Sequence, residues 1–229
     1  MTIAGSSNGR TGAFEALNLG SIPSPAANSM QTSLQNIVFD FDGVIADTFD
    51  MNWALSQECD DTATLEDFLA HHDGNVFAEP RIKFKPDNTF SADYRKRITP
   101  SHLERAYAPL TRLSEKHSLY VVSSTRDETI SEVLELSGLL PHFTRILGSQ
   151  THKSKVEKLK ILMRENGVTP DDTIFITDTL GDIREAHQVG IRTIAETFGF
   201  HDRARLEPGE PFKIVDSWDE IESVVQELS

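Results

Sequence analysis

The sequence has little cysteine and no long apolar run, and each absence narrows the class of protein. A single cysteine, Cys59, cannot form an internal disulfide, so we expect a reducing compartment and a cytoplasmic protein. No apolar run approaches the roughly 18 residues that a membrane-spanning helix needs, so we expect no membrane partner.

Basic residues are scarce as well. The chain has 22 lysines and arginines against 36 aspartates and glutamates, which gives a net charge of −14. A fold this acidic repels polyanions on average, so we expect no nucleic-acid partner. An anionic substrate must then be met by a local basic patch or by a metal ion. The 229 residues, 38% hydrophobic and 25% charged, suit a folded domain with one insertion.

Residues 1–29 differ in composition from the rest of the chain. Nineteen of them are Gly, Ser, Asn, Pro or Ala, which bury too little apolar surface to offset their ordering entropy. We therefore expect a disordered head. Two origins stay open: an ordinary flexible tail, or a mistranslated upstream segment, since residues 20–25 read like a translated transfer-RNA gene. In the second case Met30 is the true start.

Short apolar runs alternate with helical patterns over most of the remaining chain. The runs end in polar residues or glycine and predict buried strands at 37–39, 119–122, 173–177, 191–195 and 212–215, with a weaker one at 144–147. Helices are predicted at 129–137, 153–166 and 182–189. This alternation predicts an α/β fold with a doubly wound, Rossmann-like parallel sheet, whose ligands bind at the carboxyl ends of the strands.

Residues 48–115 interrupt the alternation. Helical patterns occur there at 51–57, 65–71 and 102–113, without a clear buried strand. We expect a small helical cap domain inserted after the first strand, with the core formed by residues 30–47 and 116–229. The basic stretch 81–97 could steer an anionic substrate or form an ordinary solvated surface, and the sequence leaves both open.

Two aspartates follow the first predicted strand in the order Asp40-Phe41-Asp42-Gly43. The first carboxylate can attack a phosphorus atom, and the second can protonate the leaving oxygen and later deprotonate water. Both would repel a phosphate dianion unless a cation intervened, so Mg²⁺ is required.

A second acidic pair could complete the metal site. Asp178 ends a predicted strand and Asp182 starts the next helix. Mg²⁺ prefers hard oxygen ligands, so Asp40, Asp178 and a backbone carbonyl near Asp42 suit it. We expect Asp182 to act behind them, directly or through water, with a simple helix cap as the alternative.

These motifs together resemble the haloacid dehalogenase-like superfamily, in its phosphoglycolate-phosphatase-like branch with a helical cap. The resemblance covers residues 35 to about 225. It rests on motifs in one order along the chain: Asp40 to Gly43, then Ser123, then Lys153, then Asp178 with Asp182.

The resemblance implies a role for each motif. Asp40 corresponds to the nucleophile and Asp42 to the general acid/base. Ser123, with the backbone N–H of Ser124, is expected to hold the phosphoryl group. The resemblance favours Lys153 over its rival Lys155 as the neutralising cation. Ser123 as a helix cap stays open.

We therefore expect a Mg²⁺-dependent phosphatase that hydrolyses a small phosphorylated metabolite through an aspartyl-phosphate. A phosphomutase acting on a sugar phosphate and a non-catalytic protein that binds a phosphorylated ligand are the alternatives. The sequence leaves the substrate and the oligomeric state open.

Overall fold

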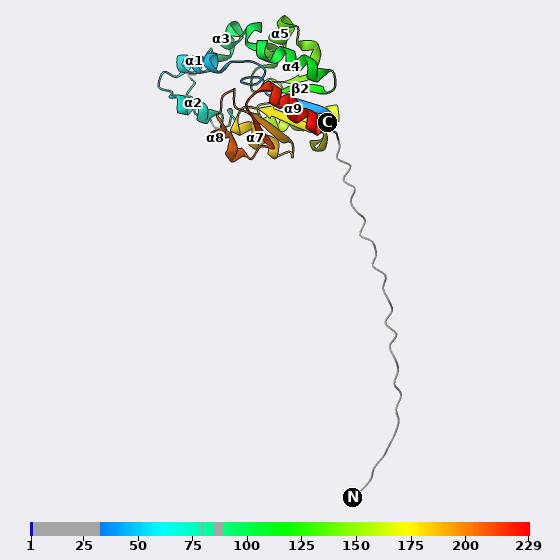
Figure 1. Ribbon diagram of the computed structural model, residues 1–229. Helices are drawn as coiled ribbons and strands as arrows, with labels where there is room; N and C mark the ends of the chain where they lie inside the picture. Colours follow the sequence, from blue (N-terminus) through cyan, green and yellow to red (C-terminus); the bar gives the residue numbers. More distant parts are fainter. Residues whose placement is uncertain (2–32, 79, 85–88) are drawn as a thin grey trace. The chain divides into compact units, whose positions relative to one another are not determined.

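The computed structural model describes Met1 and residues 33–78, 80–84 and 89–229 (Figure 1). The expectations for residues 1–29, namely disorder and a true start at Met30, fall outside the described residues. The fold described below belongs to one compact unit, Thr32–Ser229.

A parallel sheet of six strands forms the centre of the fold, which confirms the predicted α/β class. The strand order is β3-β2-β1-β4-β5-β6, and all neighbouring strands are parallel. All six strands lie within two residues of the predicted runs. Their bounds are Asn36–Phe39 (β1), Ser118–Val122 (β2), Phe143–Leu147 (β3), Thr173–Thr177 (β4), Arg192–Glu196 (β5) and Lys213–Val215 (β6).

Helices cover both faces of the sheet because alternate side chains of each strand point to opposite faces. In β1, Ile37 and Phe39 pack in one apolar cluster with residues of α4, α5 and α9. Val38, between them, packs on the other face with residues of α6 and α7. The helix bounds are Glu104–Ser114 (α4), Asp127–Ser137 (α5), Lys155–Asn166 (α6), Leu180–His187 (α7) and Trp218–Leu228 (α9).

The strand order reverses direction between β1 and β4, where two crossover connections leave in opposite directions. In doubly wound sheets a crevice opens at this point, outside the carboxyl ends of the strands. Asp40 follows β1 and Asp178 follows β4, and the Asp40 N–H donates to the Ile176 carbonyl at 2.9 Å. The two carboxylates predicted to be functional therefore meet at this crevice.

The inserted segment begins with three helices, Phe49–Cys59 (α1), Leu65–His71 (α2) and Phe90–Arg97 (α3). α1 and α2 lie at the end of the folded part opposite the C-terminus (Figure 1). α2 has the predicted bounds, whereas α3 was not predicted. α4, at the end of the predicted cap segment 48–115, packs against α9 and contributes Leu110 to the cluster on the sheet. The predicted division into core and cap stays a proposal.

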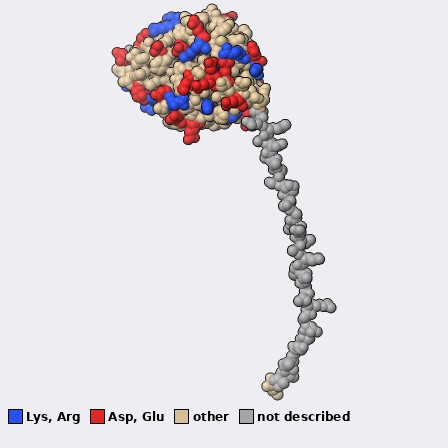
Figure 2. Space-filling view, in the orientation of Figure 1, with Lys and Arg blue, Asp and Glu red and all other residues tan. Residues whose placement is uncertain are grey.

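Charged residues of both signs are interspersed on the surface shown in Figure 2, with a group of acidic side chains near its centre. The basic stretch is partly neutralised, since Arg95 pairs with Glu132 at 2.7 Å and Arg97 pairs with Glu58 at 2.6 Å. In the described part of the chain, none of the helices has the length and apolar character of a membrane span.

Candidate active site

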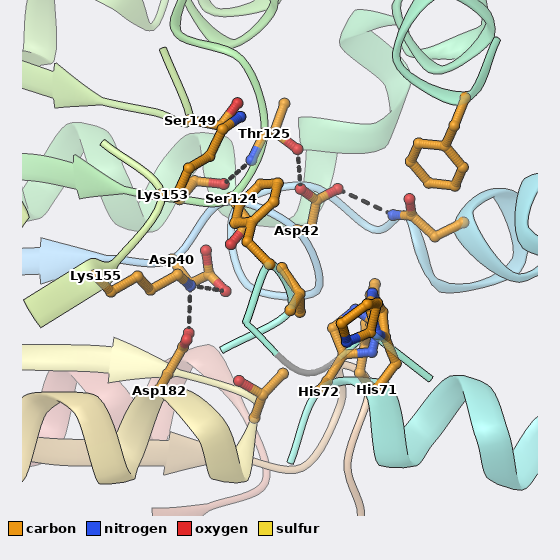
Figure 3. Close-up of a pocket in the computed structure, with 18 of the residues that line it drawn as sticks. Asp40, Asp42, His71, His72, Ser124, Thr125, Ser149, Lys153, Lys155 and Asp182 are labelled. Carbon is orange, nitrogen blue, oxygen red and sulfur yellow. Dashed lines mark hydrogen bonds and ion pairs between the residues drawn. The ribbon is translucent and has the colours of Figure 1, made fainter. Parts of the chain in front are cut away.

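Asp40 lies at the floor of a cavity of about 430 Å³, which Figure 3 shows in close-up. Asp40 directly follows the buried strand β1, so it lies at the carboxyl end of the sheet. Its Oδ1 accepts the Phe41 N–H at 2.7 Å, and its Oδ2 lies 2.8 Å from the Lys155 Nζ. Burial raises the pKa of Asp40, the Lys155 charge opposes this rise, and the charges of Asp182 and Asp178 add to it.

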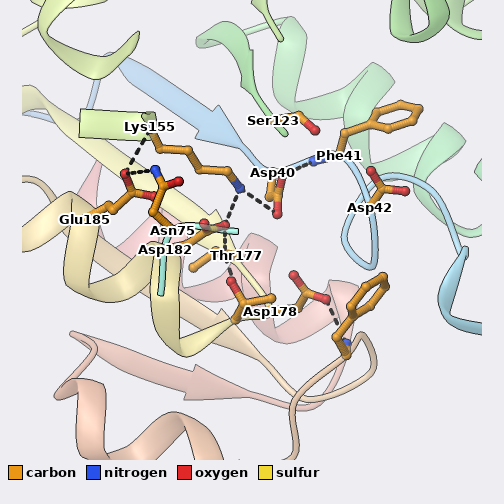
Figure 4. Close-up of polar contacts among 12 residues, drawn as sticks. Asp40, Phe41, Asp42, Asn75, Ser123, Lys155, Thr177, Asp178, Asp182 and Glu185 are labelled. Carbon is orange, nitrogen blue, oxygen red and sulfur yellow. Dashed lines mark hydrogen bonds and ion pairs between the residues drawn. The ribbon is translucent and has the colours of Figure 1, made fainter. Parts of the chain in front are cut away.

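Lys155 stands where Lys153 was expected. Ser154 is the N-cap of α6, so Lys155 is the first helical residue, and its ammonium reaches between Asp40 and Asp182 (Figure 4). The Lys155–Asp182 distance is 2.5 Å. Lys153 remains in the loop before the helix, where its Nζ lies 4.3 Å from the ring centre of Phe77. The prediction for Lys153 as the cation at Asp40 is therefore wrong, and Lys155 takes that position.

The charge of Lys155 is balanced by the two carboxylates. Burial alone would lower the pKa of Lys155, but Asp182 and Asp40 raise it above its ordinary value. Burial alone would raise the pKa of Asp182, but Lys155 holds it below its ordinary value. Thr179, rather than Asp182, occupies the N-cap of α7, and Asp182 also accepts a hydrogen bond from Thr177 at 2.7 Å. The helix-cap alternative for Asp182 is therefore wrong.

Asp178 is fully buried beside the end of β1. Its Oδ2 accepts the Phe200 N–H at 2.7 Å, while its buried Oδ1 has no hydrogen-bond partner among the described residues. Burial raises the pKa of Asp178 to about 7. Gly43, with a φ of 81°, and Gly199 pass so close that a Cβ on either would clash with the Asp178 carboxylate. The backbone therefore wraps this side chain closely.

The carboxylates suit a divalent cation that also binds water and phosphate oxygens. Within the ranges that the structure describes, no three His, Cys, Asp or Glu side chains form a metal centre by themselves. Asp178 nevertheless keeps one buried oxygen that has no hydrogen-bond partner in the described part of the chain. The same holds for Glu196, whose pKa is raised by burial and by the charge of Asp178. Mg²⁺ commonly binds one or two carboxylates and completes its shell with water and phosphate oxygens. This donor set suits that pattern.

Asp42 accepts four hydrogen bonds, which fix its orientation. Thr48, Asn52 and Tyr94 donate to Oδ1 at 2.8, 3.1 and 2.6 Å, and Thr125 donates to Oδ2 at 2.6 Å. The sequence reasoning missed Asn52 and Tyr94, which come from α1 and α3. Residues 90–97 gave no helical pattern in the sequence, so no signal pointed to Tyr94.

Ser123 and Ser124 follow β2 and line the same cavity. Ser123 is 1% exposed, and its Oγ accepts the Thr125 N–H at 3.0 Å. α5 begins only at Asp127, with Arg126 as its N-cap, so Ser123 does not cap it. The cap alternative is wrong, and the Ser123 hydroxyl proton is available to a ligand.

Lys158 lies fully buried beneath this serine and donates to its carbonyl oxygen. Burial, with the nearby Lys155 charge, lowers the pKa of Lys158 to about 8. An unfolded lysine titrates near 10.4, so between these values the unfolded chain holds a proton that the folded chain lacks. Stability therefore rises as the pH rises through this window.

We expect the wild type to gain about 2 kcal/mol of unfolding free energy between pH 7.5 and 9.5, relative to Lys158→Met. Urea unfolding at the two pH values measures this difference. Lys160→Met, at an exposed lysine of the same helix, is the control and should keep the wild-type pH dependence. Equal pH dependence in wild type and Lys158→Met would contradict the prediction.

The segment after α2 is bound to the core by Arg205, which lies in the short helix α8 (Arg203–Leu206). Its guanidinium lies 2.8 Å from both Glu66 and Asp73. The His72 carbonyl beside them accepts the Gly181 N–H at 2.9 Å. This part of the insertion is therefore tied directly to the core next to the cavity.

Arg205→Ala should loosen this attachment, because two carboxylates lose their common cation. We expect faster hydrogen exchange in residues 66–75, by about tenfold, which corresponds to roughly 1.4 kcal/mol of local opening free energy. Arg203→Ala, on the same helix, removes an exposed pair with Asp216 and should leave this segment unchanged. Equal exchange rates in the two variants would show that Arg205 does not hold the segment.

Comparisons with known proteins agree with this geometry. A family model described as haloacid dehalogenase-like hydrolase matches residues 37–196, more than half of the chain. The chain is 26% identical over 196 residues to a 5'-nucleotidase of Pseudomonas aeruginosa, covering 77% of this chain and 88% of that one. It is 27% identical over 110 residues to a phosphoglycolate phosphatase of Synechococcus elongatus, covering 48% of this chain and 52% of that one.

The chain spans about half the length of several curated relatives that it matches. A solved structure described as a predicted phosphatase from Clostridium acetobutylicum superposes with a TM-score of 0.71 at 21% identity, covering 86% of this chain and 100% of that one. This likeness supports the fold. With the family model and the order of the motifs, it identifies the chain as a member of the haloacid dehalogenase-like hydrolase family.

Proposed function

We propose that this protein is a Mg²⁺-dependent phosphatase that hydrolyses a small phosphomonoester through an aspartyl-phosphate on Asp40. One observation carries the proposal. The Asp40 carboxylate stands at the carboxyl end of β1, beside Asp178 and 2.8 Å from the Lys155 ammonium. A carboxylate in this position can act as a nucleophile, and the cation can offset charge that develops at phosphorus.

In the first step, an Asp40 oxygen forms a bond to phosphorus while the bond to the leaving oxygen breaks. Asp42 gives a proton to that oxygen, so the alcohol leaves neutral. Lys155 neutralises the attacking carboxylate, and the hydroxyl of Ser123 with the N–H of Ser124 holds phosphoryl oxygens.

In the second step, water attacks phosphorus and Asp42 takes its proton. The bond between phosphorus and Asp40 breaks, which releases inorganic phosphate and restores the free carboxylate. Thr125 and Tyr94 orient Asp42 through their hydrogen bonds to its two oxygens.

Asp40, Asp178 and a backbone carbonyl near Asp42 are the proposed ligands of Mg²⁺, with Asp182 behind them. The bound cation supplies the positive charge that lets a phosphate dianion approach these carboxylates. The unpartnered Asp178 Oδ1 and the raised pKa of Asp178 support this assignment.

The names of the relatives support a small phosphorylated metabolite as substrate, since one is a 5'-nucleotidase and another a phosphoglycolate phosphatase. We further propose a cytoplasmic location, because the chain has one cysteine and its described part has no candidate membrane span.

Release of inorganic phosphate from p-nitrophenyl phosphate tests the function. We expect release with Mg²⁺, loss of activity with excess EDTA, and recovery when Mg²⁺ is restored. Full activity in EDTA would reject the metal dependence. Absence of phosphate release across a panel of phosphomonoesters with Mg²⁺ present would reject the phosphatase assignment.

A further inference from the structure

Aromatic rings form part of the lining of the active-site cavity. We call the aromatic chamber the part of the cavity lined by Phe68, His71, His72, Phe84, Phe90 and Phe200. Phe84 is 36% exposed and Phe77, at the edge of the same cavity, is 42% exposed. Two exposed phenylalanines facing one cavity indicate a surface that receives an apolar ligand group.

The rings of the chamber form a continuous series of contacts. Phe200 lies 5.0 Å from His72 between ring centres, and His72 lies 5.2 Å from His71. The series continues from His71 to Phe84 at 6.2 Å and from Phe84 to Phe90 at 5.5 Å. These contacts are T-shaped, so ring edges and faces are both presented to neighbours. Such walls favour planar π-systems.

Both ends of this series contact the catalytic groups. At one end the Phe200 N–H donates to Asp178. At the other end Phe90 stacks at 6.4 Å on Tyr94, whose hydroxyl donates to Asp42 at 2.6 Å. Asp42 is the group proposed to protonate the leaving oxygen, so a leaving group on that oxygen would lie next to this end of the series.

The charged side chains that line the cavity all lie outside the inserted helices α1, α2 and α3. Among its described lining residues the basic side chains are Arg126, Lys153 and Lys155, all outside the inserted helices. Arg126 forms an ion pair with Glu128 at 2.9 Å. Lys153 lies over the Phe77 ring at the edge of the cavity. A second anionic group placed against the six residues of the chamber would meet no cation among them, and burying it unpaired is costly.

Two histidines add a polar pair to the chamber (Figure 3). The Nδ1 of His72 lies 2.9 Å from the Phe68 carbonyl and must donate to it, so its Nε2 carries no proton when the ring is neutral. The Nδ1 of His71 accepts the Arg81 N–H at 3.1 Å, so its Nε2 is a donor. Burial lowers the pKa of His71 to about 4 and that of His72 to about 3, which keeps both rings neutral.

From these observations we propose that the leaving group of the substrate carries a planar aromatic ring that binds in the aromatic chamber. The proposal rests on the proposed phosphatase function. A nucleoside and a simple aryl alcohol share the ring chemistry that the wall would recognise. A small acidic leaving group such as glycolate does not.

Matched pairs of substrates isolate the ring from the reactivity of the ester. AMP and ribose 5-phosphate share the same primary ester and differ in the base. Benzyl phosphate and cyclohexylmethyl phosphate share a primary ester and differ in aromaticity. We expect kcat/KM to be at least about tenfold higher for the aromatic member of one pair or of both. Preference in the first pair alone points to a nucleoside, and preference in both points to any aryl group.

Phe84→Leu tests the wall itself, because it keeps an apolar side chain but removes a ring. We expect it to lower kcat/KM for the aromatic substrate several-fold and to leave its non-aromatic partner unchanged. Phe212→Leu is the matched control, since Phe212 is 47% exposed and does not line the cavity. It should change neither substrate.

Equal kcat/KM within both pairs, or an equal loss on both members in Phe84→Leu, would overturn the proposal. If ribose 5-phosphate or cyclohexylmethyl phosphate were hydrolysed as fast as its aromatic partner, the result would still support the phosphatase function. Failure to release phosphate from any of the four esters would instead count against the phosphatase function. The two failures are therefore distinguishable.

Discussion

Asp40→Asn should lower the rate of phosphate release by about 10⁴-fold or more, because removing a covalent nucleophile leaves only binding and electrostatic assistance. The amide has nearly the same shape as the carboxylate but cannot form the phosphoryl bond. The substitution removes one of the two carboxylates that contact Lys155, but Asp182 still pairs with that ammonium, so we expect the variant to remain folded.

Phosphate release under saturating Mg²⁺ measures the loss, and intact-protein mass spectrometry after an acid quench tests for the phosphorylated intermediate. The wild type should gain the mass of one phosphoryl group, and Asp40→Asn should not. Asp47→Asn is the control, at a mostly exposed aspartate later in the same loop, and should keep wild-type activity. Substantial turnover by folded Asp40→Asn would mean that another residue is the nucleophile.

Lys155→Met should have the second largest effect, and Lys153→Met provides its comparison. The substitution keeps most of the side-chain volume but removes the cation that contacts Asp40 and Asp182. We expect kcat/KM to fall by about 10²–10³-fold, as when one electrostatic contact to the transition state is removed. Stability should fall by about 3–5 kcal/mol, since both buried carboxylates lose their partner.

Lys153→Met should change kcat/KM by less than about tenfold, because its ammonium lies over the Phe77 ring and away from Asp40. Steady-state kinetics and urea unfolding on both variants give the two effects separately. A larger activity loss in Lys153→Met than in Lys155→Met would reverse the assignment made from the structure.

The strands and the acidic residues were predictable because each depends on local sequence. Apolar runs of three to five residues that end in polar residues placed all six strands, and the order of Asp40, Asp42 and Asp178 followed from the strand ends. The choice between Lys153 and Lys155 was not local. It depended on Ser154 acting as N-cap, which shifts the first helical residue by two positions from the predicted start.

The contacts of the inserted helices could not be read from periodicity. α4 has a clear apolar face, but that pattern does not say whether the face packs on a cap or on the sheet. α3 is so polar that its few apolar residues gave no helical signal. The hydrogen bond between Tyr94 and Asp42 joins residues 52 positions apart, so only the tertiary structure reveals it.

The hydrogen bonds of Asp42 have a consequence for the timing of the reaction. Asn52 and Tyr94, on α1 and α3, both donate to its Oδ1. If these helices moved away, Asp40 would keep its place at the end of β1, but Asp42 would lose two of the hydrogen bonds that orient it. An open molecule would thus be poorly equipped to complete a cycle on a passing phosphate ester. The same movement of α1 and α3 toward the sheet would then both complete the substrate-binding cavity and orient Asp42 for proton transfer.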